Sequence, residues 1–209
     1  MVRVPDIFET PEFFQIDLSD LVKELGENDT KNILSSFVCP KNKDVEDFLR
    51  NKALEFSRQE LAKTNLVFWK CKDEIELVGY YSVCIKSISV DKNVLSNTQS
   101  KKLRANGFFD EKKNEYHIWA TLIAQLGKNF ANGNDSIISG KELLQLAVDK
   151  AKQIQKAAGG KFVYIECEES EKLIEFYTES NFKVFGRRRL DKDETNLSGT
   201  YLKQLFVLI

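Results

Sequence analysis

The stretch Phe130–Glu142, FANGNDSIISGKE, joins two parts of the chain whose hydrophobic patterns differ. Residues 118–130 before it form a hydrophobic run typical of a strand, and residues 142–158 after it repeat apolar residues at the period of a helix. Ser139 followed three residues later by Glu142 is typical of a capping box, which predicts that a helix begins there. The first N–H groups of a helix have no partner within it and lie at the positive end of its dipole. The stretch therefore predicts a strand–turn–helix unit that can bind a phosphate or pyrophosphate, although many such units bind nothing.

The composition is that of one globular domain, residues 1–209, with a full core. Hydrophobic residues make up 42% of the chain and charged residues 30%, and the formal net charge is −1. A charge this small gives no overall field to attract nucleic acid or a membrane, although Arg187–Arg189 form a local basic patch. The sequence contains no secretory signal pattern and no stretch long enough to span a bilayer. We therefore expect a cytosolic protein without a membrane partner.

The cysteines and the single histidine predict no metal site. Cys39, Cys71, Cys84 and Cys167 are not spaced as metal ligands, and only His117 could complete a set. Thiols in apolar runs most often behave as small core residues in a reducing compartment. His117 falls within an expected strand, which disfavours Ser–His and Cys–His nucleophiles.

The hydrophobic periods predict a chain that alternates strands and helices. We expect strands at residues 32–38, 66–71, 77–90, 116–130, 161–168, 182–190 and 201–209, and helices at residues 17–25, 44–61, 139–158 and 170–179. Residues 1–31 are expected to be an N-terminal extension. Residues 91–115, polar and mixed in charge, are expected to form an insertion or mobile flap with a turn of helix near Ser100. Because helices separate only some of the strands, the fold class is mixed α/β.

Three motifs placed in this order make the chain resemble the GNAT superfamily of acyl-CoA-dependent N-acetyltransferases, from about Asn32 onward. VGYYSV (78–83) is similar to the third strand of that family, LGKNFANGNDSIISGKELLQLA (126–147) to its cofactor motif, and LIEFYTESNFKVFG (173–186) to its FY…GF segment. The resemblance implies a GNAT-like fold, with a mostly antiparallel central sheet of six to seven strands flanked by helices.

Two departures from the family pattern stand in the motifs. The family's cofactor loop usually follows Gln/Arg-x-x-Gly-x-Gly/Ala, and only the final glycine is kept among the aligned positions Asp135, Ser136, Ile138 and Gly140. Asn181-Phe182 also replaces the usual Gly-Phe. The helix N-terminus, which donates through its backbone, does not depend on those glycines.

The resemblance implies transfer of an acetyl group from acetyl-CoA, without a metal, to a primary amine by direct attack. Its implied cofactor site consists of Ser136, Ile138, Ser139, Gly140 and Lys141 for the pyrophosphate, and Lys128, Asn129 and Phe130 for the pantetheine arm. The N–H of Asn129 or Phe130 would bond the thioester oxygen, and Tyr177 would be the general acid that protonates the thiolate.

Several alternatives stay open at this stage. Tyr177 could instead be a core aromatic of an amphipathic helix. Glu166, Glu168 and Glu115 are base candidates that are more typical of surface carboxylates, and a chain of waters could serve equally. Of Tyr80 and Tyr81, one should face each side of the sheet, and plain packing is the better interpretation for both.

The acceptor and the activity also have alternatives. The eroded loop allows a GNAT-like protein that has lost catalysis and acts as a binding or regulatory module. CPKNKDVEDFLRNKALEF (39–56) followed by GYYSV is similar to a toxin-like GNAT branch that acetylates aminoacyl-tRNA. The partners that the resemblance allows are thus an amine-bearing acceptor, tRNA in the toxin-like case, and a second copy in a homodimer.

Overall fold

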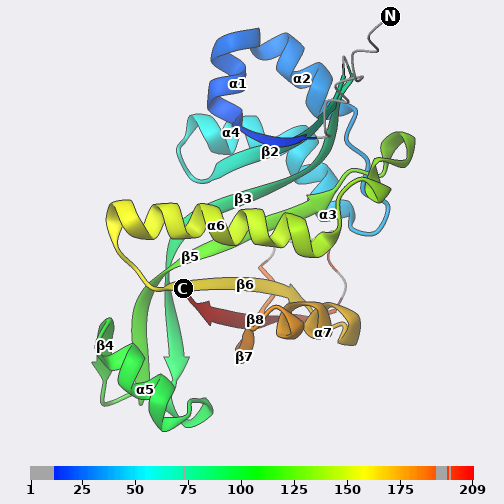
Figure 1. The fold of residues 1–209 in the computed structure, drawn as a ribbon. Coiled ribbons are helices and arrows are strands. Elements are labelled where there is room, and N and C mark those ends of the chain that lie inside the picture. Colours follow the sequence, from blue (N-terminus) through cyan, green and yellow to red (C-terminus); the bar gives the residue numbers. More distant parts are fainter. Residues whose placement is uncertain (1–11, 73, 192–196, 198) are drawn as a thin grey trace, which may run out of the picture.

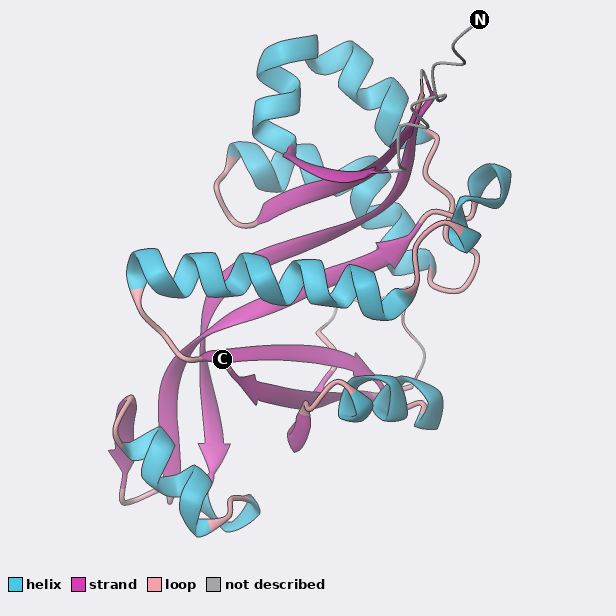
Figure 2. Ribbon diagram, in the orientation of Figure 1, coloured by secondary structure: helices cyan, strands magenta, loops and turns pink. Residues whose placement is uncertain are grey.

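The computed structural model describes residues 12–72, 74–191, 197 and 199–209, which form an eight-stranded sheet with helices on both faces (Figures 1 and 2). The strand order is β1-β2-β3-β5-β6-β8-β7, and β4 pairs with β5. Every pair is antiparallel except β5 and β6. The predicted mixed, mostly antiparallel sheet is confirmed, with one strand more than the six to seven expected.

The strands are β1 (Glu12–Asp17), β2 (Lys63–Cys71), β3 (Glu74–Asp91), β4 (Gly107–Asp110), β5 (Glu115–Lys128), β6 (Phe162–Glu168), β7 (Lys183–Arg189) and β8 (Tyr201–Leu208). The α-helices are α1 (Leu18–Leu25), α2 (Glu27–Ser35), α3 (Lys43–Asp47), α4 (Ala53–Arg58), α5 (Asn97–Arg104), α6 (Gly140–Ala158) and α7 (Glu171–Glu179). Three further turns are the π-helical η1 (Phe48–Lys52) and the 3₁₀ turns η2 (Lys92–Val94) and η3 (Ala131–Ser136). None of the helices in the described ranges is long and apolar enough to cross a membrane.

The N-terminal part of the chain differs most from the prediction. Its described residues include β1, which pairs with β2 along the edge of the sheet. The strand expected at residues 32–38 is wrong: residues 27–35 form α2, which buries Thr30 and Leu34 one helical turn apart. An apolar run this short does not distinguish a helix from a strand by its period.

The helix that follows begins earlier than predicted. Its N-cap is Asn42, two residues before the predicted start at residue 44, because the Asn42 Oδ1 accepts from the N–H groups of Asp44 and Val45 at 3.0 and 3.2 Å. The helix passes through the π-turn η1 and ends at Arg58. Its start therefore lies directly after the loop that reaches the end of β5.

The insertion at residues 91–115 extends the sheet. β3 and β5 run on together, β4 adds to β5, and the helix near Ser100 is the two-turn α5 with a capping box at Ser96 and Gln99. Leu103 of α5 is buried in a core cluster with Tyr116 and Ile118 of β5.

The two faces of the sheet carry different helices. One face packs against α6 and α7 through a cluster that includes Tyr81, and the other packs against α1 to α4 through a cluster that includes Tyr80. Both rings are fully buried, so the prediction that they face opposite sides is confirmed. The hydroxyl of Tyr80 donates to the carbonyl of Val45 at 2.6 Å, and that of Tyr81 donates to the Gln15 amide oxygen. These contacts support the packing interpretation for both tyrosines.

Candidate active site

The two central strands β5 and β6 separate where the site begins. They pair in parallel only over Thr121–Ile123 and Val163–Ile165. Beyond that point β5 stays paired with β3, and β6 stays paired with β8, so the strands diverge, as Figure 1 shows. We call the divergence beyond Ile123 and Ile165 the fork.

A bulge in β5 accounts for the fork. Ser82 of β3 pairs with Gln125, and the next residue, Val83, pairs with Ile123, so Ala124 is an extra residue on β5. A bulge bends its strand and increases its twist, which turns β5 away from β6 at this residue.

Beyond the bulge, β5 presents backbone groups to the fork. The N–H of Asn129 donates to the carbonyl of Val78 on β3 at 2.9 Å. Because successive residues of a strand direct their N–H and C=O groups to alternate edges, those of Leu126 and Lys128 point away from β3. This edge can pair with an extended ligand as an added strand would.

The N–H groups of Asn129 and Phe130, which were expected to bond a thioester oxygen, already donate hydrogen bonds within the protein. The N–H of Phe130 donates to the carbonyl of Val38 at 2.8 Å, and that of Asn129 is taken by Val78. Neither N–H is therefore free as an oxyanion donor in this structure. The N–H groups that point away from β3 are those of Leu126 and Lys128. Lysine ammonium groups flank the Phe130 ring, with Lys41 at 4.9 Å and Lys128 at 5.9 Å from its centre.

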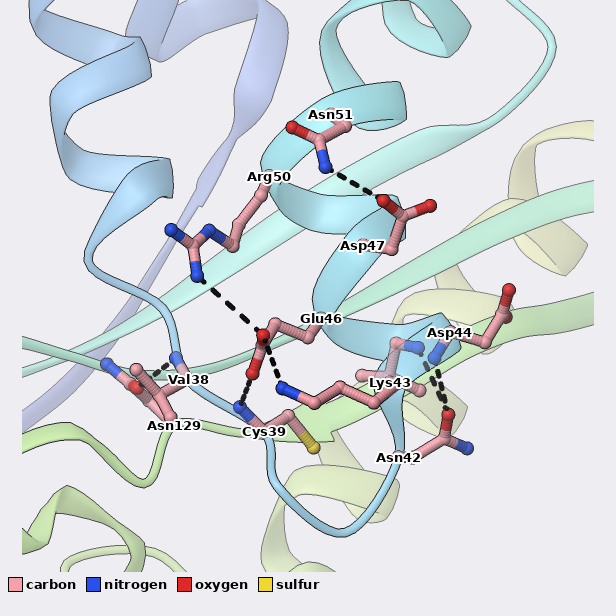
Figure 3. A network of polar contacts seen from close by, with 11 residues as sticks. Val38, Cys39, Asn42, Lys43, Asp44, Glu46, Asp47, Arg50, Asn51 and Asn129 are labelled. Carbon is pink, nitrogen blue, oxygen red and sulfur yellow. Dashed lines mark hydrogen bonds and ion pairs between the residues drawn. The ribbon is translucent and has the colours of Figure 1, made fainter. Parts of the chain in front are cut away.

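The side chain of Asn129 anchors the loop before α3. Its Oδ1 accepts from the N–H group of Val38 at 2.9 Å, as Figure 3 shows. The same oxygen accepts from the N–H of Ala131 at 3.1 Å, and the Nδ2 donates to the carbonyl of Leu77 at 2.8 Å. The residue is 2% exposed. Its contacts are therefore those of a scaffold residue, a role that the sequence did not indicate.

The start of α6 has the predicted capping box. The Ser139 Oγ accepts from the Glu142 N–H at 3.1 Å, and the Glu142 carboxylate accepts from the Ser139 N–H at 2.8 Å. These bonds from Ser139 lower the pKa of Glu142, which keeps the carboxylate charged. The N–H groups of Gly140 and Lys141 are the first-turn donors that the box leaves over.

The other residues predicted to bind the cofactor are held in different ways. The Ser136 hydroxyl donates to the carbonyl of Gly133 at 2.8 Å, and Ile138 is buried in the core at 1% exposure. The ammonium of Lys128 donates to the carbonyl of Asp135 at 2.6 Å, and that of Lys141 pairs with Glu179 at 2.8 Å. This site could therefore bind a diphosphate mainly through its backbone.

Tyr177 lies on α7 beside the start of α6. Its ring packs edge-on against Phe176 at 4.9 Å and Phe182 at 6.0 Å. A Cβ added to Gly140 would lie 3.3 Å from the Phe176 ring, so the two helices are in contact there. The Tyr177 hydroxyl makes no hydrogen bond to any residue in the described ranges, and burial, with a smaller effect of Cys167, raises its pKa. The hydroxyl therefore stays protonated and available as a donor.

The candidate bases are placed differently. The Glu166 carboxylate, on the first residue of β6 beyond the fork, accepts from Arg188 Nε at 2.7 Å and Gln204 Nε2 at 2.9 Å. Glu115 begins β5, at the opposite end of that strand from the fork. His117, on the same far part of β5, hydrogen-bonds to Ser89.

The four cysteines are free thiols, and burial raises the pKa of Cys167 to about 11. In the part of the chain that the structure describes, no three His, Cys, Asp or Glu side chains could hold a metal ion.

Similar proteins were found among solved structures alone. No family model and no curated protein matches this sequence. AtaT complexed with acetyl-methionyl-tRNAfMet has a TM-score of 0.62 and 16% identity, and the similarity covers 94% of this chain and 95% of that one. A tyrosine-to-phenylalanine mutant of KacT has a TM-score of 0.60 and 15% identity over 94% of this chain and 95% of that one. AtaTR bound with acetyl-CoA has a TM-score of 0.54 and 17% identity over 94% and 93%. This chain thus has a GNAT-like fold, as its motifs predicted, and that fold is similar to the folds of AtaT and KacT.

Proposed function

We propose that this protein is an N-acetyltransferase that moves an acetyl group from acetyl-CoA to a primary amine by direct attack. Three features support the proposal: β5 and β6 diverge beyond Ile123 and Ile165, a capped helix begins at Gly140, and the Tyr177 hydroxyl on the adjacent α7 has no hydrogen-bond partner in the described part of the chain. A thioester carrier needs donors for its diphosphate, an edge for its extended arm and an acid beside its sulfur. The matched solved structures include one with acetyl-CoA bound, which supports the same cofactor here.

Each group has a defined part in the transfer. The N–H groups of Gly140 and Lys141 bind the diphosphate. The N–H of Leu126 or Lys128 bonds the thioester oxygen as charge grows on it, a contribution of about 3 kcal/mol to the barrier. The amine nitrogen forms a bond to the acetyl carbon, the carbon–sulfur bond breaks, and Tyr177 gives its proton to the departing sulfur. The amine attacks as the neutral base and then loses one proton to water, and Tyr177 regains a proton from water.

Titration calorimetry with acetyl-CoA and a Tyr177→Phe variant test the proposal. We expect acetyl-CoA to bind, and Tyr177→Phe to lower kcat roughly 10²-fold or more while its Kd for acetyl-CoA stays nearly the same. Tyr116→Phe, in the core on the opposite face, is the matched control and should keep full kcat. Unchanged turnover in Tyr177→Phe would remove this residue from its role.

Aminoacyl-tRNA is a specific candidate for the acceptor. The matched AtaT structure contains acetyl-methionyl-tRNAfMet, and residues 39–56 resemble the toxin-like branch. An α-amino group has a pKa near ~8, so it loses its proton more readily than a lysine side chain. Labelled acetyl-CoA with charged tRNA, uncharged tRNA and a polyamine would identify the acceptor. Label in the polyamine alone would exclude the tRNA candidate.

The second candidate is an inactive binding module, motivated by the eroded loop. A ligand that binds only the folded state must raise the melting temperature. A melting temperature that does not change with millimolar acetyl-CoA would favour the inactive module.

A further inference from the structure

A cavity of about 240 Å³ lies between α5 and the end of the sheet formed by β6, β7 and β8. In Figure 1 the end of β8 points to the side of the molecule that carries α5. Residues of α5, of the beginnings of β6 and β7 and of the end of β8 line the cavity, among them Lys102, Leu103, Phe162, Lys183, Phe206 and Leu208.

The cavity is separate from the fork. Phe162 is the first residue of β6, whereas the fork begins beyond Ile165, and a rise of about 3.3 Å per residue places these two residues roughly 10 Å apart along the strand. Neither Tyr177 nor the first turn of α6 lines the cavity. The proposed acetyl transfer therefore gives this cavity no role.

The floor of the cavity is apolar. Leu103, Phe162 and Phe206 are at most 5% exposed and belong to one core cluster. The two phenylalanine rings meet edge-on, with their centres 5.9 Å apart. Apolar surface in contact with water is unfavourable, so an apolar ligand would be stabilised on this floor. The volume is below the roughly 300–1,000 Å³ of sites for drug-sized ligands, which limits the ligand to a single ring or a short chain.

The rim of the cavity is cationic. Lys102 lies on α5 and Lys183 begins β7, and neither ammonium forms an ion pair with a residue in the described ranges. None of the described residues that line the cavity is acidic. Two cations at one rim repel each other, and an anion between them would be attracted to both.

The backbone of β8 adds a hydrogen-bond donor. The N–H of Ile209 donates to the carbonyl of Lys161, on the β6 side, at 2.9 Å. Because successive residues of a strand direct their N–H groups to alternate edges, that of Leu208 points to the β7 side. β7 begins at Lys183, which pairs with Phe206, so β7 does not extend as far as Leu208. The N–H of Leu208 therefore points past the start of β7, along the edge that lines the cavity.

We propose that this cavity binds a small aryl carboxylate. The ring lies on the phenylalanine floor, and the carboxylate lies between Lys102, Lys183 and the N–H of Leu208. The site goes beyond the proposed acetyl transfer and does not depend on it. Because α5 belongs to the insertion at residues 91–115, the bound ligand would join this insertion to the C-terminal strands.

Phenylacetate and its neutral analogue phenylacetamide, which have nearly the same shape, test the need for an anion. NMR titration of the ¹⁵N-labelled full chain follows both compounds. We expect phenylacetate to bind at millimolar concentration and to shift the amide signals of Leu103, Lys183 and Leu208, and phenylacetamide to shift them much less. Equal shifts with both compounds, phenylacetate shifts at other residues only, or no shifts would overturn the proposal.

A double variant, Lys102→Gln with Lys183→Gln, tests the two cations. Both lysines are exposed, so the variant should fold, and its melting curve checks this. We expect its Kd for phenylacetate to rise roughly three- to tenfold, since each exposed charged contact contributes modestly. The matched control, Lys101→Gln with Lys172→Gln, removes two exposed lysines outside the cavity and should keep the Kd.

The same Kd in the double variant and the control would overturn the assignment of the two lysines. The titration needs neither acetyl-CoA nor turnover. Its outcome is therefore independent of whether the protein transfers an acetyl group.

Discussion

Single residues at the site have local environments that set their chemistry. Burial raises the pKa of Tyr177, and so its proton is retained through the neutral and mildly alkaline range in which an amine becomes a nucleophile. The capping box of Ser139 and Glu142 at the start of α6 was predicted from a local sequence pattern. Tyr177 was singled out by the family resemblance, and its role as general acid stays a prediction. The scaffold contacts of Asn129 were not predicted, because its partners, Val38 and Leu77, are distant in sequence.

Glu142 should weaken acetyl-CoA binding. Its carboxylate stays charged beside the N–H groups that would bind a diphosphate, and like charges at an exposed site repel modestly. We expect Glu142→Gln, which can still close the capping box, to lower the Kd for acetyl-CoA roughly two- to fivefold. The gain should shrink in high salt. Calorimetry at two salt concentrations measures it, and a higher Kd at low salt would contradict the repulsion.

Glu46 should make the free energy of unfolding depend on pH in the acidic range. A hydrogen bond from the N–H of Cys39, followed by the contact with Lys43, lowers its pKa below the usual 4.5. The stabilisation is therefore complete above pH 4.5 and is lost as the pH falls through the lower folded value. Glu46→Gln should be less stable than the unmodified protein at pH 7, and the gap should narrow by pH 3.5. Urea unfolding at both pH values checks this, and a constant gap would rule out the linkage.

At the scale of elements, the bulged strand and the helix after it define the site. The bulge at Ala124 could not be predicted, because it follows from the register of β5 against β3 rather than from any residue type. The strands β2 and β3 and the helices α6 and α7 were predicted because their periods run long enough to be distinctive.

Backbone amides of β5 should respond differently to acetyl-CoA. The N–H groups of Leu126 and Lys128 face the fork, whereas those of Asn129 and Phe130 are already bonded to Val78 and Val38. We expect hydrogen exchange at Leu126 and Lys128 to slow with acetyl-CoA, and exchange at Asn129 and Phe130 to be slow in both states. Exchange followed by NMR resolves the four amides. Equal protection at Leu126 and Lys128 with and without ligand would count against the added-strand model.

Gly127 allows α3 to lie close to β5. A Cβ at this position would be 2.3 Å from the Val45 Cγ1 and 3.3 Å from the Phe37 ring. Gly127→Ala should therefore push α3 from the sheet and destabilise the protein by about 1–3 kcal/mol. Adding Val45→Ala should recover part of the loss, because the two changes share one contact. Denaturant unfolding measures both, and additive losses would exclude the clash.

At the scale of the whole molecule, the fold was predictable in its C-terminal two-thirds and less so before residue 40. The strand predicted at residues 32–38 was wrong, and β1 was missed, because both depend on which segments meet at the sheet edge. The position of β1 is fixed by tertiary contacts such as the stacking of Phe14 on Phe68, whose ring centres are 5.4 Å apart. Such pairings are tertiary contacts, so the β-propensity of the residues cannot predict them.

The extra residue Ala124 in β5 has a consequence for cofactor binding, because the bulge that it forms separates β5 from β6. Shortening the chain by Ala124 would leave Ile123 and Gln125 as direct neighbours on alternate sides, so every later side chain would keep its orientation. The shortened protein should fold with an unaltered circular dichroism spectrum. Calorimetry should detect no binding of acetyl-CoA, because β5 and β6 would stay paired beyond Ile123 and Ile165. Retained affinity for acetyl-CoA would mean that the fork does not depend on Ala124.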